Sequence, residues 1–341
     1  MVKQQNVVFF IGAGFSAPFG LPVMSNFINK AKDLYFFDGL KYKDIEKTLK
    51  LIEKFSVVKN YMAVDLHNIE DLLSIAYMES VVSKNSRALN DISSFIKTVI
   101  NAYTGSVRRE TLNFTNLVSN ISLVKGSTFI PSSDGNRRVE NFEMLPKGKK
   151  YENTNFGIIS LNYDMIIENS LSALADEYGK FYSLANRPNP LKTHFSTRKL
   201  DTVPGIAMAK LHGSIDSHIV PPTWNKNVNA NIQDDWKLAT RLLIDATHVI
   251  FVGYSLPSSD NYIKYLLASS LNRNKRLKKI TVVTMDGDGN TMTRYNSLFA
   301  TSPSFHNVDT MLFFNALKNY DASFDFDSFD KSFSAFCNQQ K

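Results

Sequence analysis

The sequence predicts an α/β protein: a Rossmann-like parallel sheet with helices on both faces and a helical insertion domain. Three observations support this prediction. Short apolar runs alternate along the chain with segments of helical periodicity. These runs are apolar throughout, and strands that are covered on both faces have this composition. A long stretch of helical spacing separates the first apolar run from the second.

The first predicted strand is Val7 to Ile11, a short apolar run that ends in glycine. Helical spacing begins at Pro22 in the segment PVMSNFINKAKDLY. From about Asp38 to about Ser106, apolar residues recur three and four positions apart, which predicts several more helices. Residues 107–150 are more polar, contain GNRR and PKGKK, and are predicted to be loops.

Four more strands are predicted in the second half of the chain. They are the runs FGIISLNYD, GIAMAKLHGS, HVIFVGYSLP and KKITVVTMD. The segments MIIENSLSALADEYG, WKLATRLLIDA and DNYIKYLLASSL follow the first three of them and have the spacing of helices. Residues 183–204 are rich in proline and basic residues and are predicted to be irregular.

The end of the chain, FDFDSFDKSFSAF, repeats phenylalanine at short intervals. Its five aromatic residues are Phe324, Phe326, Phe329, Phe333 and Phe336. We expect this stripe to pack on its own domain, and the alternative is a docking surface for another subunit or partner. The predicted division is a Rossmann-like domain of residues 1–36 plus 154–320, a helical insertion of residues 37–153, and an aromatic tail or helix of residues 321–341.

Composition limits the function classes. The 341 residues are 43% hydrophobic and 21% charged, which is ordinary for a globular protein. The formal charge of +7 is dispersed. The basic segment KTHFSTRK has little aromatic interleaving, so a solvated basic surface is favoured and direct nucleic-acid binding stays open.

The lone cysteine, Cys337, excludes an intrachain disulfide and a four-cysteine zinc site. There is no signal-like N-terminus and no apolar run of about 20 residues, so we expect a cytoplasmic protein without a membrane segment.

Polar or glycine-containing stretches end the five predicted strands: GAGFS, NYD, HGS, GYS and MD. The carboxyl ends of parallel strands meet at one edge, where such sheets bind ligands. In the first stretch, Gly12, Gly14 and Ala17 satisfy G-x-G-x-x-[GA], a spacing that lets a diphosphate approach the backbone. A tight corner between strand and helix is the alternative. Asp33 lies within a predicted helix and not at a strand end, so an ordinary dehydrogenase is not supported.

Four motifs in this order, GAGFSAPFGLP, SLNYD, KLHGS and VGYSLP, resemble the sirtuin-like family. The resemblance implies that NAD is the ligand and that the Rossmann-like domain binds it. It assigns catalysis to Asn162 and His212. The implied NAD-binding residues are Gly12, Ala13, Gly14, Phe15, Ser16, Asp164, Gly253, Ser255 and, by a looser match to the adenosine ribose, Asp286.

Departures from the protein-deacylating sirtuins refine the resemblance. The four-cysteine zinc module is missing, so no zinc is expected. Val23, Met24 and Ser25 stand where those enzymes carry Asp-Phe-Arg, and Leu161 stands in the place of a glutamine. A helical insertion takes the place of the zinc module. The chain thus resembles the bacterial sirtuin-like NADases of anti-phage defence.

The resemblance implies an NAD glycohydrolase that yields nicotinamide and ADP-ribose or its cyclic form. His212 would be the base, Asn162 would orient the ribose or water, and Asp164 would contact nicotinamide or stabilise positive charge. Homo-oligomerisation or a separately encoded ATPase, helicase or Argonaute would provide control.

Alternative interpretations remain at each level. His212, Asn162 and Asp164 could be turn-forming or helix-capping residues, and Asp260 is expected to cap a helix. The alternative activities are an NAD-dependent protein deacylase or ADP-ribosyltransferase, and a non-catalytic module that binds NAD or ADP-ribose.

Overall fold

The computed structural model describes residues 5–55, 65–104, 127–130, 143–146, 154–169, 207–220, 233–258, 260–319 and 325–339. The predicted irregular segment 183–204, which includes KTHFSTRK, lies outside the described residues, as do Phe324 and most of the predicted loops 107–150. Of the predicted helix that follows the second strand, only the helical turn 166–169 lies within them.

A six-stranded parallel sheet forms the centre of the molecule, in the order β5-β4-β1-β6-β7-β8. Its strands are β1 Gln5–Ile11, β4 Thr154–Ser160, β5 Ala207–Lys210, β6 His248–Val252, β7 Lys279–Val283 and β8 Ser304–His306. Counted along the chain within this sheet, the order is 3-2-1-4-5-6, which is the doubly wound Rossmann order. The predicted Rossmann-like fold is confirmed. The last strand, β8, was not predicted, because its three residues are too few to give a periodic signal.

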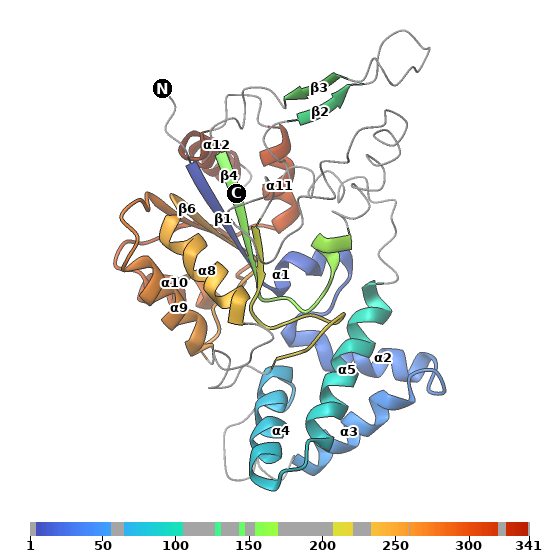
Figure 1. The fold of residues 1–341 in the computed structure, drawn as a ribbon. Helices are drawn as coiled ribbons and strands as arrows, with labels where there is room; N and C mark the ends of the chain where they lie inside the picture. The colour runs from blue at the N-terminus through green and yellow to red at the C-terminus, as the bar shows by residue number, and fades with distance from the viewer. Residues whose placement is uncertain are drawn as a thin grey trace.

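Helices cover both faces of the sheet because successive side chains of its strands point to opposite sides. On β1, Val7 and Phe9 belong to one buried cluster, and Val8 and Phe10 belong to another. The helices on the second face are α8 Gln233–Asp245, α9 Asn261–Leu271 and α10 Asn290–Leu298, which lie together in Figure 1. The helices α11 Thr310–Asn319 and α12 Phe326–Gln339 pack on the first face.

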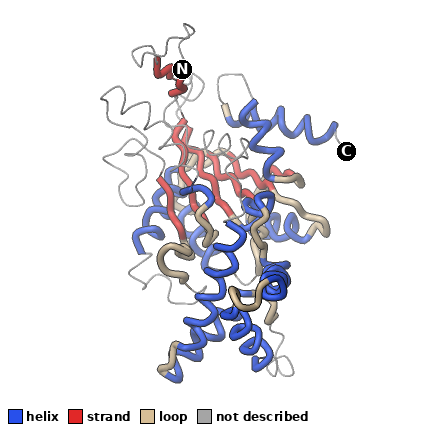
Figure 2. The backbone as a smooth tube through the Cα atoms, turned by 90° about the vertical axis from the view of Figure 1, so that its right-hand side faces the viewer, coloured by secondary structure: helices blue, strands red, loops and turns tan. Residues whose placement is uncertain are grey.

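A group of helices extends from the carboxyl edge of the sheet (Figures 1 and 2). It contains α2 Phe27–Phe37, α3 Lys43–Phe55, α4 Ile69–Ser83 and α5 Arg87–Thr104. The short helix α1 Ala13–Ser16 and the 3-10 turns Ala17–Phe19 and Met24–Asn26 join β1 to this group. Its apolar residues merge with the first core of the sheet, so the helices and the sheet share one hydrophobic cluster.

Two short antiparallel strands occur where loops were predicted. They are β2 Ser127–Ile130 and β3 Glu143–Pro146, which pair with each other. The loop prediction for residues 107–150 is wrong at these positions. Four-residue strands within a polar segment are too short for their alternation to be recognised in the sequence.

The aromatic stripe at the end of the chain packs on its own domain. Of its described residues, Phe326, Phe329 and Phe333 are buried on α12 and Phe336 is exposed. The rings of Phe329 and Phe333 both lie against Phe313 of α11, with centroids 5.5 and 5.3 Å away. These contacts support the self-packing interpretation over a docking surface.

A buried carboxylate fixes α12 to the sheet. Asp330 accepts hydrogen bonds from His306 Nε2 at 2.9 Å and Ser304 Oγ at 3.0 Å, and it also pairs with Lys279. Burial by itself would raise the pKa of Asp330, but the hydrogen bonds from His306 and Lys279 outweigh it and lower the pKa to about 2. The charged form is therefore favoured in the folded protein.

The linkage between this pKa and folding gives the first prediction. The pKa of Asp330 is lower when folded than its ordinary 3.8, so its contribution of about 2 kcal/mol is present above pH 4 and is lost as pH falls towards 2. We expect urea unfolding between pH 7 and 2 to show a smaller acid loss in Asp330→Asn, which starts less stable at pH 7. The exposed Asp216→Asn is the control. Equal pH dependence in wild type and Asp330→Asn would contradict the assignment.

Candidate active site

A cavity of about 740 Å³ lies at the carboxyl edge of the sheet. Its walls come from the loops that follow β1, β4, β5, β6, β7 and β8, and from the first turn of α4. All but two of the predicted site residues line it. The nine predicted residues that line the cavity are Gly12, Ala13, Gly14, Ser16, Asn162, Asp164, His212, Gly253 and Ser255.

Phe15 and Asp286 are not brought to the cavity. The side chain of Phe15 is buried in the core, where its ring lies edge-on to Phe314 at 5.9 Å. Asp286 faces α10 instead, and its carboxylate accepts hydrogen bonds from the backbone amides of Thr291 at 3.1 Å and Met292 at 2.9 Å. The predicted contact of Asp286 with the adenosine ribose is therefore not supported, because its carboxylate binds the N-terminus of α10.

The glycine turn packs directly against the loop that follows β6. Gly14 N donates to Gly253 O at 2.8 Å, and Gly12 N donates to Val252 O at 3.0 Å. A Cβ on Gly253 would lie 2.1 Å from Phe15 N, and its φ of +61° is one that other residues rarely adopt. A Cβ on Gly12 or Gly14 would likewise lie 2.7 or 2.8 Å from backbone atoms of this loop, so the tight-corner interpretation describes part of the role of the glycine turn. Gly12, Gly14 and Gly253 also line the cavity.

A hydrogen-bonded chain links the turn to the loop after β4. Asn162 Nδ2 donates to Gly12 O and to Ser16 Oγ, each at 3.0 Å. Ser16 Oγ in turn donates to Asp164 Oδ2 at 2.7 Å. Asp164 Oδ1 accepts from Ile166 N at 3.1 Å, so this residue also begins the helical turn 166–169. The three side chains are nearly buried and are held in one arrangement at the cavity wall.

Lys210, at the end of β5, ties the two loops of the site together. Its ammonium donates to Glu168 Oε1 at 2.7 Å, to Ser214 Oγ at 3.1 Å and to the backbone oxygen of Asp164. Burial raises the pKa of Glu168, and the charge of Lys210 opposes that rise. Sequence reasoning missed this residue, although a lysine at the end of the apolar strand AMAK is a signal for a buried partner.

His212 is almost fully buried, with 1% of its surface exposed. Its Nδ1 lies 3.8 Å from Oε1 of Glu70, and its ring centroid lies 6.0 Å from that of Tyr163. The loop after it is closed by hydrogen bonds from Val220 N to His212 O at 3.0 Å and from Ser214 N to His218 O at 3.1 Å. The imidazole therefore has a fixed place in the cavity wall.

Several lining residues were not predicted. Asn68, Ile69 and Glu70 come from the start of α4, and the sequence NIED there has the form of a capped helix start. Two hydroxyl groups of the lining, on Tyr163 and Thr310, are buried and have no hydrogen-bond partner among the described residues. Burial raises the pKa of Tyr163 well above its ordinary value, so this hydroxyl stays protonated and can donate.

The charged lining is acidic. Its carboxylates belong to Glu70, Asp164, Asp260 and Asp309, and no lysine or arginine is among the described residues that line the cavity. Asp260 precedes α9 as expected, but its side chain makes no cap bond and accepts a hydrogen bond from Tyr254 Oη at 2.8 Å instead. Within the described parts of the chain, no cluster of histidine, cysteine and acidic residues is arranged to hold a metal ion.

Comparison with known proteins identifies the class. Residues 157–302 match the family of SIR2-like domains. The chain therefore carries a SIR2-like domain, which confirms the resemblance to the sirtuin-like family. No curated protein matches the chain. None of the described helices is long and apolar enough to cross a bilayer.

Solved structures of Sir2 proteins are also similar to the chain. One is Sir2Tm bound to a propionylated peptide, with 13% identity over 92% of this chain and 91% of that chain and a TM-score of 0.35. A structure on the mechanism and regulation of Sir2 enzymes has 13% identity, the same coverage of both chains and a TM-score of 0.39. A complex of Sir2 with a p53 peptide and NAD+ has 11% identity, again the same coverage, and a TM-score of 0.35. Similarity this low says nothing about the site.

Proposed function

We propose that this protein is an NAD glycohydrolase, which cleaves NAD to nicotinamide and ADP-ribose or its cyclic form. One observation carries the proposal: the glycine turn, Asn162 and His212 line a single cavity, although they come from three separate strands. The SIR2-like domain supports NAD as the ligand. The cavity volume of about 740 Å³ lies within the range of small-molecule sites.

The shape of the cavity suits an extended dinucleotide. Its lining runs from His212 after β5 to Asp309 and Thr310 after β8, at opposite edges of the sheet. Six strands at the usual spacing span roughly 24 Å. The nicotinamide end would lie near Asn162 and His212, and the diphosphate would pass over the glycine turn in the middle. The adenosine end would then lie near β7 and β8, where Thr310 offers its hydroxyl.

The acidic lining suits the reaction. Nicotinamide is bound to ribose through a positively charged ring nitrogen and leaves as a neutral molecule, so its departure needs no general acid. The ribose carbon develops positive charge, which the carboxylate of Asp164 would stabilise. As the carbon–nitrogen bond breaks, its electron pair stays on nicotinamide. Water then attacks the ribose carbon, and His212 takes the proton that the water loses.

The Asn162 side chain would orient the attacking group. Its Nδ2 is committed to Gly12 and Ser16, so its Oδ1 is the atom that can accept a hydrogen bond from water or a ribose hydroxyl. We expect Asn162→Ala to lower NAD turnover by about 100-fold, because both the orienting oxygen and the tie to the glycine turn are lost. The exposed Asn90→Ala is the control.

The test measures NAD, nicotinamide, ADP-ribose and cyclic ADP-ribose by chromatography with the purified full chain. Nicotinamide released without any added peptide, and lost in Asn162→Ala, is the expected result. Release that requires an acetylated peptide would indicate a deacylase. NAD that binds in calorimetry and stays intact would indicate a non-catalytic module. Either of these outcomes contradicts the proposal.

In the cell, the activity would deplete NAD during phage infection. This part of the proposal rests on the motif resemblance to the anti-phage NADases. Such an enzyme must be restrained until it is needed, and homo-oligomerisation or a separately encoded ATPase, helicase or Argonaute would provide that control. The proposed location of this activity is the cytoplasm.

A further inference from the structure

Glu70 is a charged residue of the cavity wall that lies beside the proposed base. Its side chain is 14% exposed, and Oε1 lies 3.8 Å from Nδ1 of His212, whose side chain is 2% exposed. A carboxylate and a protonated imidazole at this distance attract each other strongly when both are shielded from water. Glu70 belongs to α4, in the predicted insertion, whereas His212 belongs to the Rossmann-like domain.

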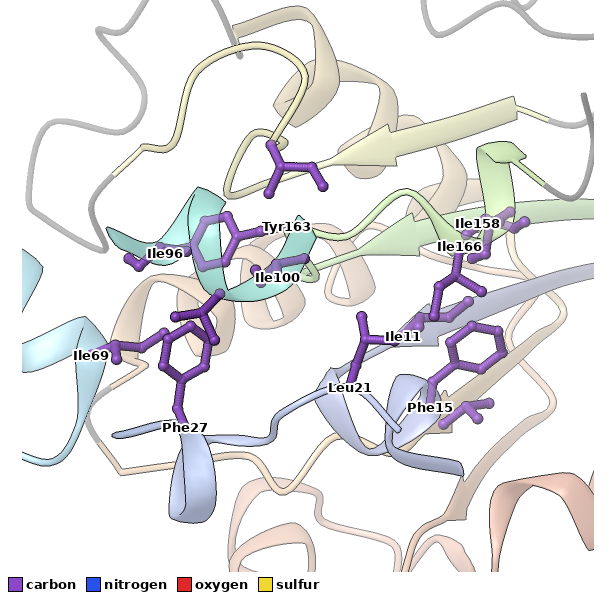
Figure 3. Close-up of a cluster of buried hydrophobic side chains, with 14 of the residues drawn as sticks. Ile11, Phe15, Leu21, Phe27, Ile69, Ile96, Ile100, Ile158, Tyr163 and Ile166 are labelled. Atoms are coloured by element: carbon purple, nitrogen blue, oxygen red, sulfur yellow. The ribbon is translucent and has the colours of Figure 1, made fainter. Parts of the chain in front are cut away.

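The position of Glu70 is fixed by its surroundings. Asn68 caps α4, and its Oδ1 accepts hydrogen bonds from Glu70 N at 2.9 Å and Asp71 N at 3.4 Å. The neighbouring Ile69 is buried in the core that the helices share with the sheet. Figure 3 shows Ile69 beside Phe27, and Tyr163 beside Ile96 and Ile100 of α5. The first turn of α4 is therefore held against the site by apolar packing.

Other titratable groups line the same cavity as this pair. Tyr163 comes from the loop after β4, Tyr254 and Asp260 come from the loop and cap around β6 and α9, and Asp164 lines the same cavity. Burial, and then the charge of Glu70, raise the pKa of Tyr163. For Tyr254, burial and Asp260 dominate, and Glu70 adds to the rise in pKa. The charge of Glu70 therefore acts on both tyrosines, whose raised pKa keeps them neutral near pH 7.

We propose that Glu70 is a positioning residue for His212: its carboxylate faces the Nδ1–H group, favours the tautomer that carries hydrogen on Nδ1 and leaves Nε2 to act as the base. This inference rests on the proposed NAD glycohydrolase function. When Nε2 takes a proton from water, the imidazole becomes a cation, and the Glu70 carboxylate stabilises that cation. The helical insertion thereby completes the active site, because it supplies the carboxylate that lies within ion-pair distance of His212.

A structural role for Glu70 predicts different results. An acidic residue in the first turn of α4 also interacts favourably with the helix dipole. Removal of the charge would then change helix stability but leave the titration of His212 unchanged. Glu79 lies on the same helix and is exposed, so Glu79→Gln is a matched control for the loss of a carboxylate from α4.

The decisive measurement is the pKa of His212 by NMR of the histidine ring nitrogens, with the signal assigned from His212→Ala. We expect Glu70→Gln to lower this pKa by about one unit or more, because a carboxylate at this distance favours the charged imidazole. Glu79→Gln should leave the pKa of His212 unchanged. In Glu70→Asp, the pKa of His212 should lie between the values of the wild type and of Glu70→Gln. An unchanged His212 titration in Glu70→Gln overturns the proposal.

Kinetics then separate this inference from the function on which it rests. For Glu70→Gln we expect kcat to fall at least about tenfold with KM nearly unchanged, and the acid limb of kcat/KM to move to lower pH. Full activity in Glu70→Gln, when His212→Ala is inactive, overturns the role of Glu70 alone. A wild-type chain that binds NAD and leaves it intact overturns the proposed function itself, whatever the NMR titration gives.

Discussion

Replacement of His212 by alanine is expected to lower NAD turnover by about 1,000-fold, which is the size of effect that loss of a general base produces. The imidazole is buried in the cavity wall beside Glu70, and an alanine side chain there has no atom that can accept the proton. Binding of the product ADP-ribose should change by only a few-fold, because the glycine turn and the loop after β6 are untouched. Chromatography and calorimetry give the two quantities.

The exposed His218→Ala is the matched control, since it removes an imidazole from the same loop. Wild-type turnover in His212→Ala would exclude this residue as the base and would leave the cavity without its proposed chemistry.

The same variant tests the cellular role. Infected cells that carry the wild-type protein should lose NAD, and cells that carry His212→Ala should keep it. Equal NAD levels in both would contradict the defence hypothesis.

The Gly253→Ala variant is expected to have the largest effect on stability. A left-handed φ costs a residue with a Cβ about 1 kcal/mol. In addition, the new Cβ would lie 2.1 Å from Phe15 N and 2.3 Å from the carbonyl carbon of Gly14, both of which are backbone atoms. The two turns must separate, so we expect a total loss of about 3 kcal/mol or more, together with weaker NAD binding. Urea unfolding and calorimetry measure both effects.

Two other glycines separate the causes. Gly20 has a φ of +86°, but a Cβ added there would have no atom within 4 Å, so Gly20→Ala isolates the conformational cost. Gly287 has open space without a left-handed φ, so Gly287→Ala should be nearly neutral. If Gly253→Ala costs no more than Gly20→Ala, the contact between the two turns is not what requires a glycine there.

The insertion has a place in the chemistry if Glu70 acts as proposed. The apolar core that α4 shares with the sheet gives a physical link between the two parts of the chain. A small displacement of α4 would lengthen the distance between Glu70 and His212, which is already 3.8 Å. Activity would then respond to any partner or oligomer contact that moves this helix.

The sequence by itself determined five of the six strands of the main sheet and the edge at which the cavity lies. Apolar runs such as VVFFI and HVIFV are long enough to identify buried strands, and their polar ends identify the edge where a ligand binds. The four motifs indicated the resemblance to SIR2-like domains, which residues 157–302 match, and they contain the nine predicted residues that line the cavity. These features are local, so neighbouring residues encode them.

Only the tertiary structure decided which side chains share the cavity. The sequence placed Asp286 at a strand end, but the folded chain turns its carboxylate to the backbone of α10. Glu70 lies in a segment for which the sequence predicted only a helix, and the packing of α4 brings its side chain to His212. Lys210 likewise ties two loops of the site together only because the folded chain brings Glu168 and Ser214 to its ammonium group. Such pairings depend on how distant segments pack, and no periodicity or spacing in one segment records the partner supplied by another.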